Sequence, residues 1–389
     1  MGPHVDGFKA WLLERGYSPG TVRNMLKAAG QLGRWMTNVD LDVAGLNATS
    51  VEAFVQSCRE RGVGRVPGVR SFSPLLDYLR NERLLDEEHP PPTPIDELMC
   101  DYRAWLVADR GLAAPTVLRY ENLARRFLVE RAAQDDERFV EDLSGADVVG
   151  FLLRESSRVS VGAAKGRVAE LRSLLRFLNV KGLTATALAS AVPPVAGWRD
   201  TGVPRGVAAT EVQRLLDSCD RTDPGGLRDL AILTLVARLG LRSAEVARLD
   251  LGDLDWRAGE LVVRGKARRM DRLPMPGDVG EALAAYLSEA RPTTEIRSVF
   301  LALKAPIRAI RPDLVTDVTQ RACDRAGVPR VGAHRLRHAL ATEMLRRGAT
   351  LVAVSQVLRH RDLATTAIYA KVDLGTLRSV AQPWPGAAQ

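Results

Sequence analysis

Residues 332–348, GAHRLRHALATEMLRRG, form the most informative stretch of the sequence. The segment is predicted to be a helix, whose rise places His334 and Arg337 one turn apart on one face. An arginine can hold two phosphate oxygens at once, and a histidine beside it can handle a proton. The stretch therefore predicts a helical domain that presents a phosphate-binding pair.

Reactive side chains are concentrated around and after this helix. Three of the five histidines, His334, His338 and His360, lie within 27 positions, and Tyr369 follows His360 by nine residues. His334 and His338 are also four residues apart, a spacing that fits a zinc site on one helix face. From these residues alone, both phosphate chemistry and a metal site remain open.

The net charge is distributed unevenly along the chain. The 55 Lys and Arg exceed the 47 Asp and Glu by eight, and the whole excess lies in residues 201–389, which hold 29 basic and 21 acidic residues. A basic domain of this kind suits a polyanion through phosphate contacts and counterion release. The charge therefore favours a polyanionic partner such as a nucleic acid, although many proteins that bind no nucleic acid share it.

Composition argues against several other classes of protein. No stretch approaches the ~20 apolar residues of a membrane span, and the first residues lack the pattern of a signal peptide. The four cysteines lie far apart with no CxxC pair, which argues against a disulfide framework or a cysteine zinc site. We expect a soluble, cytoplasmic, nucleoid-associated protein with no membrane partner.

Two proline-rich stretches, 89–96 and 192–206, predict linkers and hence three domains, at 1–88, 96–190 and 205–389. The first two segments repeat each other. AWL followed by Arg-Gly and Thr-Val occurs from residue 10 and again from residue 104, and LLDYLR at 75–80 matches LLRFLN at 174–179. We predict a duplicated all-α domain, of the SAM-like type, with about four helices in each copy.

The third segment is predicted to be a mostly helical α+β domain with a small antiparallel sheet. Residues 260–264 and 270–274 alternate around Gly265-Lys266, which indicates a β-hairpin, and 298–302 is expected to add a strand. Thr210 and Gln213 have the spacing of a capping box before a helix.

Five motifs follow one another in this segment: LGLRSAEVARL (239–249), VVRGKARRMDRLPMP (262–276), HRLRHALAT (334–342), LRH (358–360) and TTAIYAKV (365–372). In these motifs the chain resembles the tyrosine recombinases of the phage-integrase family. The resemblance covers the whole third segment and, more loosely, the second, which is similar to the core-DNA-binding domain of that family. Arg359 departs from the usual glycine, so the local helix approach beside it differs from the family pattern.

The resemblance implies a site-specific recombinase whose partner is double-stranded DNA, which it cuts and rejoins through a 3′-phosphotyrosyl link, with no cofactor and no metal. It implies a role in integration, excision or transposition of a DNA element by a homo-oligomer of two to four subunits, with other recombinases as further candidate partners. The catalytic roles fall on six residues: Arg242, Lys266, His334, Arg337, His360 and Tyr369.

The residue types suit this chemistry. Attack on a phosphodiester builds negative charge on the nonbridging oxygens, which Arg242 and Arg337 can stabilise in place of a metal. Tyrosine, with an unperturbed pKa of ~10, needs a base, and His334 is the candidate. His360 would hydrogen-bond the phosphate. Glu245 either orients one of the cations or is an ordinary surface carboxylate.

The leaving 5′ oxygen needs a proton. Lys266 can donate it, because neighbouring cations lower the pKa of a lysine. These neighbours on the predicted hairpin are Arg264, Arg268 and Arg269, which are also candidate DNA contacts.

Candidate DNA contacts also lie in the two helical segments. In the second they are Arg119, Arg125, Arg126, Lys165, Arg167 and Arg172. The first segment is net neutral and binds either DNA or a partner subunit; its candidate phosphate contacts are Arg23, Lys27, Arg34, Arg65 and Arg70.

Other functions fit part of the pattern. A zinc hydrolase using His334, His338 and His360 is disfavoured by Arg337, because a guanidinium beside a dication is costly. A DNA-binding protein without catalysis rests only on the charge. A type IB topoisomerase-like or telomere-resolving enzyme would keep the same chemistry; the tail after Tyr369 favours recombination, since in the family such a tail commonly packs on a neighbouring subunit.

Overall fold

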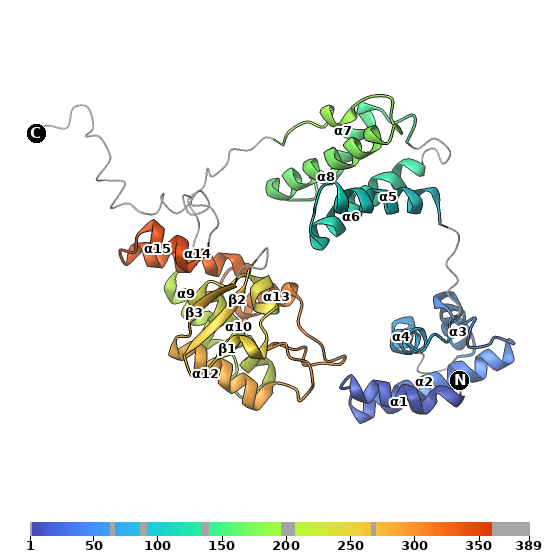
Figure 1. Ribbon diagram of the computed structural model, residues 1–389. Helices are drawn as coiled ribbons and strands as arrows, with labels where there is room; N and C mark the ends of the chain where they lie inside the picture. The colour runs from blue at the N-terminus through green and yellow to red at the C-terminus, as the bar shows by residue number, and fades with distance from the viewer. Residues whose placement is uncertain are drawn as a thin grey trace, which may run out of the picture. The chain divides into compact units, whose positions relative to one another are not determined.

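The computed structural model describes residues 2–62, 67–85, 92–133, 140–195, 207–265 and 270–359. The protein is mostly helical with one three-stranded antiparallel sheet (Figure 1). The chain divides into two compact units, residues 1–86 together with 200–389, and residues 87–199. In the described part of the chain, no helix is long and apolar enough to cross a membrane.

Residues 2–85 form a small helical bundle with its own hydrophobic core. Leu12, Leu32, Val51 and Leu79 are fully buried in that core. Its helices are α1 (Val5–Glu14), α2 (Pro19–Asn38), α3 (Ala48–Glu60) and α4 (Ser73–Asn81), with 3-10 turns η1 (Gly2–His4) and η2 (Val69–Phe72).

Residues 92–195 form a second bundle with a separate core. Its elements are α5 (Pro94–Ala108), α6 (Ala114–Ala132), α7 (Gly145–Ser156), α8 (Val161–Val180) and η3 (Leu188–Ser190). The expected linker over 89–96 is wrong at its C-terminal end, because Thr93 and Asp96 form a capping box that starts α5 at Pro94. Residues 89–91 and 196–206 of the predicted linkers lie outside the described residues.

The two bundles place their repeated residues in matching contacts. The Trp11 ring lies 6.1 Å from the Tyr78 ring, and the Trp105 ring lies 5.7 Å from the Phe177 ring. An arginine stacks on each tryptophan, and the glycine after it has a positive φ in both copies. The third helix of each bundle also begins with a capping box. These correspondences support the interpretation of the repeat as a duplication.

The C-terminal part is built around one helix that is apolar on almost every side, as a central helix must be. This helix is α10 (Pro224–Leu239), and it packs against α9, α11, α12, α13 and α14. The bounds of the elements are α9 (Ala209–Asp217), α11 (Ser243–Ala247), η4 (Leu251–Asp253), β1 (Leu254–Asp255), β2 (Glu260–Arg264), β3 (Met270–Pro274), α12 (Gly277–Ala285), the π-helical η6 (Tyr286–Ala290), α13 (Pro312–Ala326), α14 (Ala333–Arg346) and α15 (Leu351–Val357).

The predicted hairpin is present, because β2 pairs antiparallel with β3 and places Leu261 opposite Leu273. Strand β1 adds a third member on the other side of β2. The strand expected over 298–302 is wrong. Ser298 and Leu301 make only isolated bridges, to Asp250 and Ala309, since the segment runs past a helix end and a loop instead of a strand.

The capping box expected at Thr210 is also wrong. Helix α9 starts one residue earlier, at Ala209, so Thr210 lies inside its first turn. The Ala208 N–H donates to the Glu211 carboxylate over 2.8 Å, so Glu211 caps the start of α9 at Ala208 in place of the expected pair Thr210 and Gln213.

Candidate active site

A left-handed glycine positions the first candidate arginine. Helix α10 ends at Leu239, and Gly240 follows with φ +59°. A Cβ atom at Gly240 would lie 2.8 Å from a Leu358 methyl group, so only glycine fits both the backbone and the space. The tight turn delivers Arg242 to the start of α11.

A buried carboxylate holds this arginine. Glu245 Oε1 accepts a hydrogen bond from Arg242 Nη1 over 2.7 Å, and Oε2 accepts from the Arg242 backbone N–H over 2.9 Å. The Arg242 side chain is 44% exposed and the Glu245 side chain 5%. Glu245 therefore fixes the base of an arginine whose outer face stays open to solvent, in agreement with the expectation that Glu245 orients a cation.

Arg359 is a residue whose part in the site the sequence did not reveal. It has φ +54°, a region that favours glycine, yet its side chain is buried and donates from Nη2 to Glu245 Oε2 over 2.9 Å. Burial by itself raises the pKa of Glu245, but the hydrogen bond from the Arg242 backbone and the charges of both arginines outweigh it and hold that pKa below its usual value. One ionised carboxylate thus joins two arginines.

Arg337 lies on α14 and is the largest fully buried side chain among the described residues, at 1% exposure. Its guanidinium donates to the carbonyl oxygens of Gly240 and Leu358. It therefore ties α14 to the two segments that carry Arg242 and Arg359. In this arrangement the guanidinium is directed at protein carbonyls.

His334 lies one turn before Arg337 on α14, as predicted, and its ring meets that of His338 edge-on at 4.3 Å. Although His334 keeps an exposed surface, burial of the remainder and the charges of Arg337 and Arg242 lower its pKa. Burial, the neighbouring His334 and two arginines lower the pKa of His338 to about 4. Both imidazoles are therefore neutral near pH 7.

Three of the six predicted catalytic residues, Lys266, His360 and Tyr369, lie outside the described residues, as do Arg268, Arg269 and the tail. Arg264, at the end of β2, is half exposed and donates to the buried Asp253 carboxylate over 2.6 Å. The described part of the chain contains no group of three His, Cys, Asp or Glu that could hold a metal ion.

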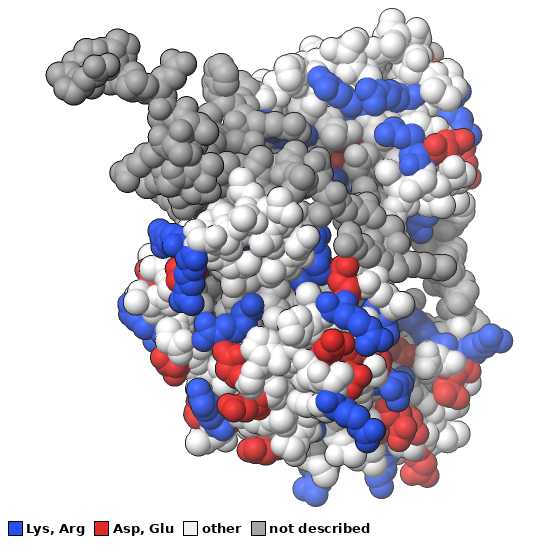
Figure 2. Space-filling model, turned by 60° about the vertical axis from the view of Figure 1, so that its left-hand side comes forward, with Lys and Arg blue, Asp and Glu red and all other residues white. Residues whose placement is uncertain are grey.

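In the middle bundle, the structure brings four of the six candidate DNA contacts together. Arg119, Arg125, Arg126 and Arg167 line one groove of about 500 Å³. Buried glutamates hold most of them from below: Glu170 pairs with Arg119 and Arg167, and Glu155 with Arg126. On the face of the molecule drawn in Figure 2, Lys and Arg side chains lie among Asp and Glu side chains.

The other two candidates do not line this groove. Arg172 donates over 2.7 Å to the backbone carbonyl of Val192, which directs it into the bundle. Lys165 is exposed on α8.

Comparison with known proteins identifies the family. The model of the phage integrase family matches residues 206–375. A putative integrase/recombinase, y4rA of Sinorhizobium fredii, is 39% identical over 392 residues, which cover 99% of this chain and 95% of the relative. Tyrosine recombinase XerD of Mycobacterium tuberculosis is 33% identical over 306 residues, covering 74% of this chain and 95% of the relative.

Solved structures share the fold. XerH recombinase bound to a palindromic difH substrate matches with a TM-score of 0.55 and 18% identity, over 76% of this chain and 98% of that one. A lambda integrase dimer bound to a COC′ core site matches with a TM-score of 0.55 and 14% identity, over 87% and 90%. The chain belongs to the phage integrase family and is a site-specific tyrosine recombinase that cuts and rejoins DNA.

Proposed function

We propose that Tyr369 is the nucleophile of this recombinase. Its oxygen bonds to the phosphorus of one DNA strand, the 5′ oxygen leaves with a proton from Lys266, and a 3′-phosphotyrosyl link stores the energy of the broken bond. Ligation reverses these steps with a 5′ hydroxyl from the exchanged strand. The observation that best supports this proposal is the hydrogen-bond network of Arg242, Glu245 and Arg337. It brings the two candidate phosphate-binding arginines together around one turn of the chain.

Arg242 and Arg337 have different parts in this proposal. Arg242 is anchored by Glu245 yet 44% exposed, so it can bind a nonbridging oxygen without rearrangement. Arg337 is directed at the carbonyls of Gly240 and Leu358, so it binds phosphate by exchanging one of these acceptors for a phosphate oxygen. Catalysis then depends on DNA binding to complete the site.

His334 is the proposed base. Its lowered pKa keeps the ring neutral near pH 7, and a neutral imidazole can accept the proton of the tyrosine hydroxyl. His360 is the proposed hydrogen-bond donor to the phosphate. The lowered pKa of His334 is caused by burial and by the same arginines that bind the phosphate.

We assign the groove of the middle bundle to DNA backbone contact. Three of its four arginines, Arg119, Arg126 and Arg167, are held by buried glutamates, so they are ordered before DNA arrives and lose little conformational freedom on binding. The separate cores of residues 2–85, 92–195 and 207–359 support three domains, although the first and third fall in one compact unit. The third domain would carry out the strand cleavage.

We propose a homo-oligomer of two to four subunits that moves a DNA element. The lambda integrase relative was crystallised as a dimer on a core site. The integrase of transposon Tn1549, with a TM-score of 0.52 and 15% identity, was crystallised with a circular intermediate DNA. Exchange of two strand pairs requires one nucleophile for each strand, which supports assembly on the DNA.

The test is Tyr369→Phe on a nicked duplex. We expect the variant to bind DNA with wild-type affinity and to form no covalent adduct, because phenylalanine lacks the attacking oxygen. Denaturing gel electrophoresis detects the adduct. Adducts at the wild-type level in the variant would assign the nucleophile to another residue.

A further inference from the structure

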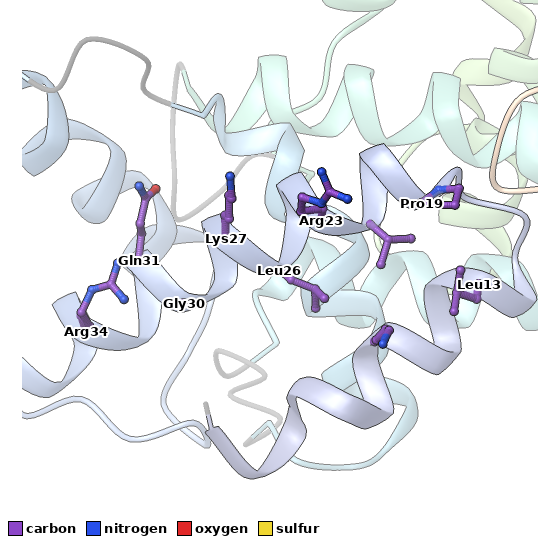
Figure 3. Close-up of a pocket in the computed structure, with 10 residues that line it drawn as sticks. Leu13, Pro19, Arg23, Leu26, Lys27, Gly30, Gln31 and Arg34 are labelled. Atoms are coloured by element: carbon purple, nitrogen blue, oxygen red, sulfur yellow. The ribbon is translucent and has the colours of Figure 1, made fainter.

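The N-terminal bundle contains a groove between α1 and α2 of about 830 Å³. Four cations line it: Lys9 from α1, and Arg23, Lys27 and Arg34 from α2. Figure 3 shows Arg23 and Lys27 projecting to the same side of α2, as residues four apart on a helix do. The apolar part of the lining includes Leu13 and Leu26, against which long basic side chains can lay their stems.

The cations of this groove are not neutralised by any residue in the described part of the protein. All four side chains are exposed, and none of the ten lining residues is acidic. Within the described part of the chain, no carboxylate lies within ion-pair distance of any of the four. Four unpaired cations on one surface repel one another, which is a cost that an anionic ligand removes.

The middle bundle provides an internal reference, because it contains the corresponding groove between α5 and α6, of about 280 Å³. Trp11 corresponds to Trp105 and Thr21 to Thr116, and with these two matches five lining positions of one groove correspond to lining positions of the other. Lys9 corresponds to Arg103, Arg23 to Leu118, Leu26 to Glu121, Lys27 to Asn122 and Gly30 to Arg125.

In that copy the groove is neutralised. Arg103 makes two hydrogen bonds to Glu121, of 2.6 and 3.0 Å, and Arg125 pairs with Asp96 over 2.8 Å. In the N-terminal groove, Leu26 occupies the position of Glu121, and Lys9 occupies the position of Arg103. Lys9 therefore lacks the carboxylate that pairs with Arg103 in the middle bundle. The same helix pair thus carries internal ion pairs in one copy and unpaired cations in the other.

We propose that the α1–α2 groove binds the phosphate backbone of double-stranded DNA. This contact is separate from the one assigned to the middle-bundle groove that Arg119 and Arg126 line. This inference rests on the proposed function of the chain as a DNA recombinase. Arg23 and Arg34 are eleven residues apart, or ~16 Å along α2, and one DNA strand presents several phosphates over that distance. A row of cations with that reach fits a polymer of phosphates better than a single small anion.

The test compares two double variants in a Tyr369→Phe background. Arg23→Gln with Lys27→Gln removes two groove cations, and Arg59→Gln with Arg83→Gln removes two exposed cations of the same bundle that do not line the groove. Affinity for a long duplex is measured against salt concentration. We expect the groove variant to lower the salt slope by ~2, at ~0.9 per lost phosphate contact, and to shorten the footprint, whereas the control changes neither.

A second variant adds a charge without removing one. Leu26→Glu introduces a carboxylate beside Lys9, as in the middle bundle, and should weaken binding in the same direction. Equal salt slopes and footprints for wild type, the groove variant and Leu26→Glu would overturn the proposal. An unchanged slope with loss of assembly would assign the groove to an acidic protein surface and would overturn it as well.

Covalent adduct formation separates this proposal from the catalytic one. The groove variant with Tyr369 intact should form adducts on a short nicked duplex at the wild-type level, because no proposed catalytic residue lies in the N-terminal bundle. Absence of adducts from the wild-type protein would count against the nucleophile, whatever the groove variants show.

Discussion

Arg359 and Glu245, 114 positions apart in the chain, are joined by a hydrogen bond of 2.9 Å with both side chains at least 95% buried. Glu245 uses its other oxygen to hold Arg242. A buried charge pair is stabilising only when its geometry and its remaining hydrogen bonds are good. Here both oxygens of the Glu245 carboxylate accept hydrogen bonds. Arg359 therefore positions Arg242 through Glu245, although Arg359 itself does not reach the solvent-exposed side of the site.

Arg359→Gly should therefore impair cleavage although Arg359 touches no proposed reacting atom. The substitution leaves a buried carboxylate with one partner fewer, which costs ~3–5 kcal/mol, while glycine relieves ~1–2 kcal/mol of left-handed strain. We expect a net loss of ~1–4 kcal/mol in the free energy of unfolding and a slower single-turnover cleavage with little change in DNA affinity. Urea unfolding and rapid-quench cleavage measure the two effects.

Arg330→Gly is the matched control, since Arg330 pairs with Asp324 at the surface with both side chains about half exposed or more. Such an exposed pair should contribute little to stability. Arg359→Lys should recover part of the cleavage rate by restoring a charge. A wild-type cleavage rate in Arg359→Gly would show that Arg359 contributes to the stability of the fold but does not position Arg242.

The pH dependence of the cleavage rate should report the protonation of the His334 imidazole. Its pKa lies below 6.5 because burial and nearby arginines disfavour the imidazolium, so the neutral base persists as the pH falls through 6.5. We expect the acidic limb of the single-turnover rate below pH 6.5. Arg335→Gln removes one of the charges that lower this pKa and should move the limb to higher pH. A limb above pH 6.5 in the wild type, or one that Arg335→Gln leaves in place, would contradict His334 as the base.

Local patterns predicted much of the fold. The alternation of residues 260–264 and 270–274 predicted β2 and β3, and the motif around His334 predicted α14, because both are encoded by neighbouring residues. Strand β1 was not predicted, since two residues carry no periodicity. The segment 298–302 has the composition of a strand, but its bridge partners come from distant irregular segments that a sequence pattern does not reveal.

The site was predictable in its parts but not in its connections. Arg242, His334 and Arg337 each lie in a recognisable motif, and the expectation for Glu245 followed from its spacing. The sequence showed Arg359 only as a departure from glycine. Its partner is far away in the chain, and its backbone adopts a left-handed conformation that arginine seldom takes. No local rule connects such a residue to Arg242.

Lys266 is predicted to protonate the leaving oxygen. Lys266→Ala should slow cleavage by ~10²-fold or more, in the range of general-acid catalysis. A 5′-bridging phosphorothiolate leaves without a proton, so the variant should be largely rescued on that substrate. Single-turnover rates on the two substrates make the comparison. An undiminished defect on the phosphorothiolate would mean that Lys266 positions DNA.

Cleavage should persist in excess EDTA, because the proposed charge stabilisation comes from Arg242 and Arg337. Adduct formation on a nicked duplex is measured with and without the chelator, and a metal-dependent nuclease run in parallel confirms that chelation is complete. Loss of cleavage that zinc or magnesium restores would support the metal-centred alternative with His334 and His338.

Gly240 should be needed for both stability and cleavage. An alanine there would be strained at φ +59° and would place its methyl group 2.8 Å from a Leu358 methyl and 3.2 Å from a Leu340 methyl. Gly327→Ala is the matched control, because Gly327 also ends a helix at φ +63° but a Cβ there meets only the Arg214 guanidinium, at 3.8 Å. Left-handed strain alone costs ~1–2 kcal/mol.

We therefore expect Gly327→Ala to lose about that much stability and to keep its cleavage rate. Gly240→Ala should lose more, because crowding adds to the strain, and should cleave slowly, because the Gly240 carbonyl accepts the hydrogen bond from Arg337. Urea unfolding and single-turnover cleavage of the two variants give the comparison. Equal losses of stability in Gly240→Ala and Gly327→Ala would mean that Leu358 and Leu340 move aside to make room for the methyl group. Crowding at Gly240 would then not be what fixes the position of Arg337.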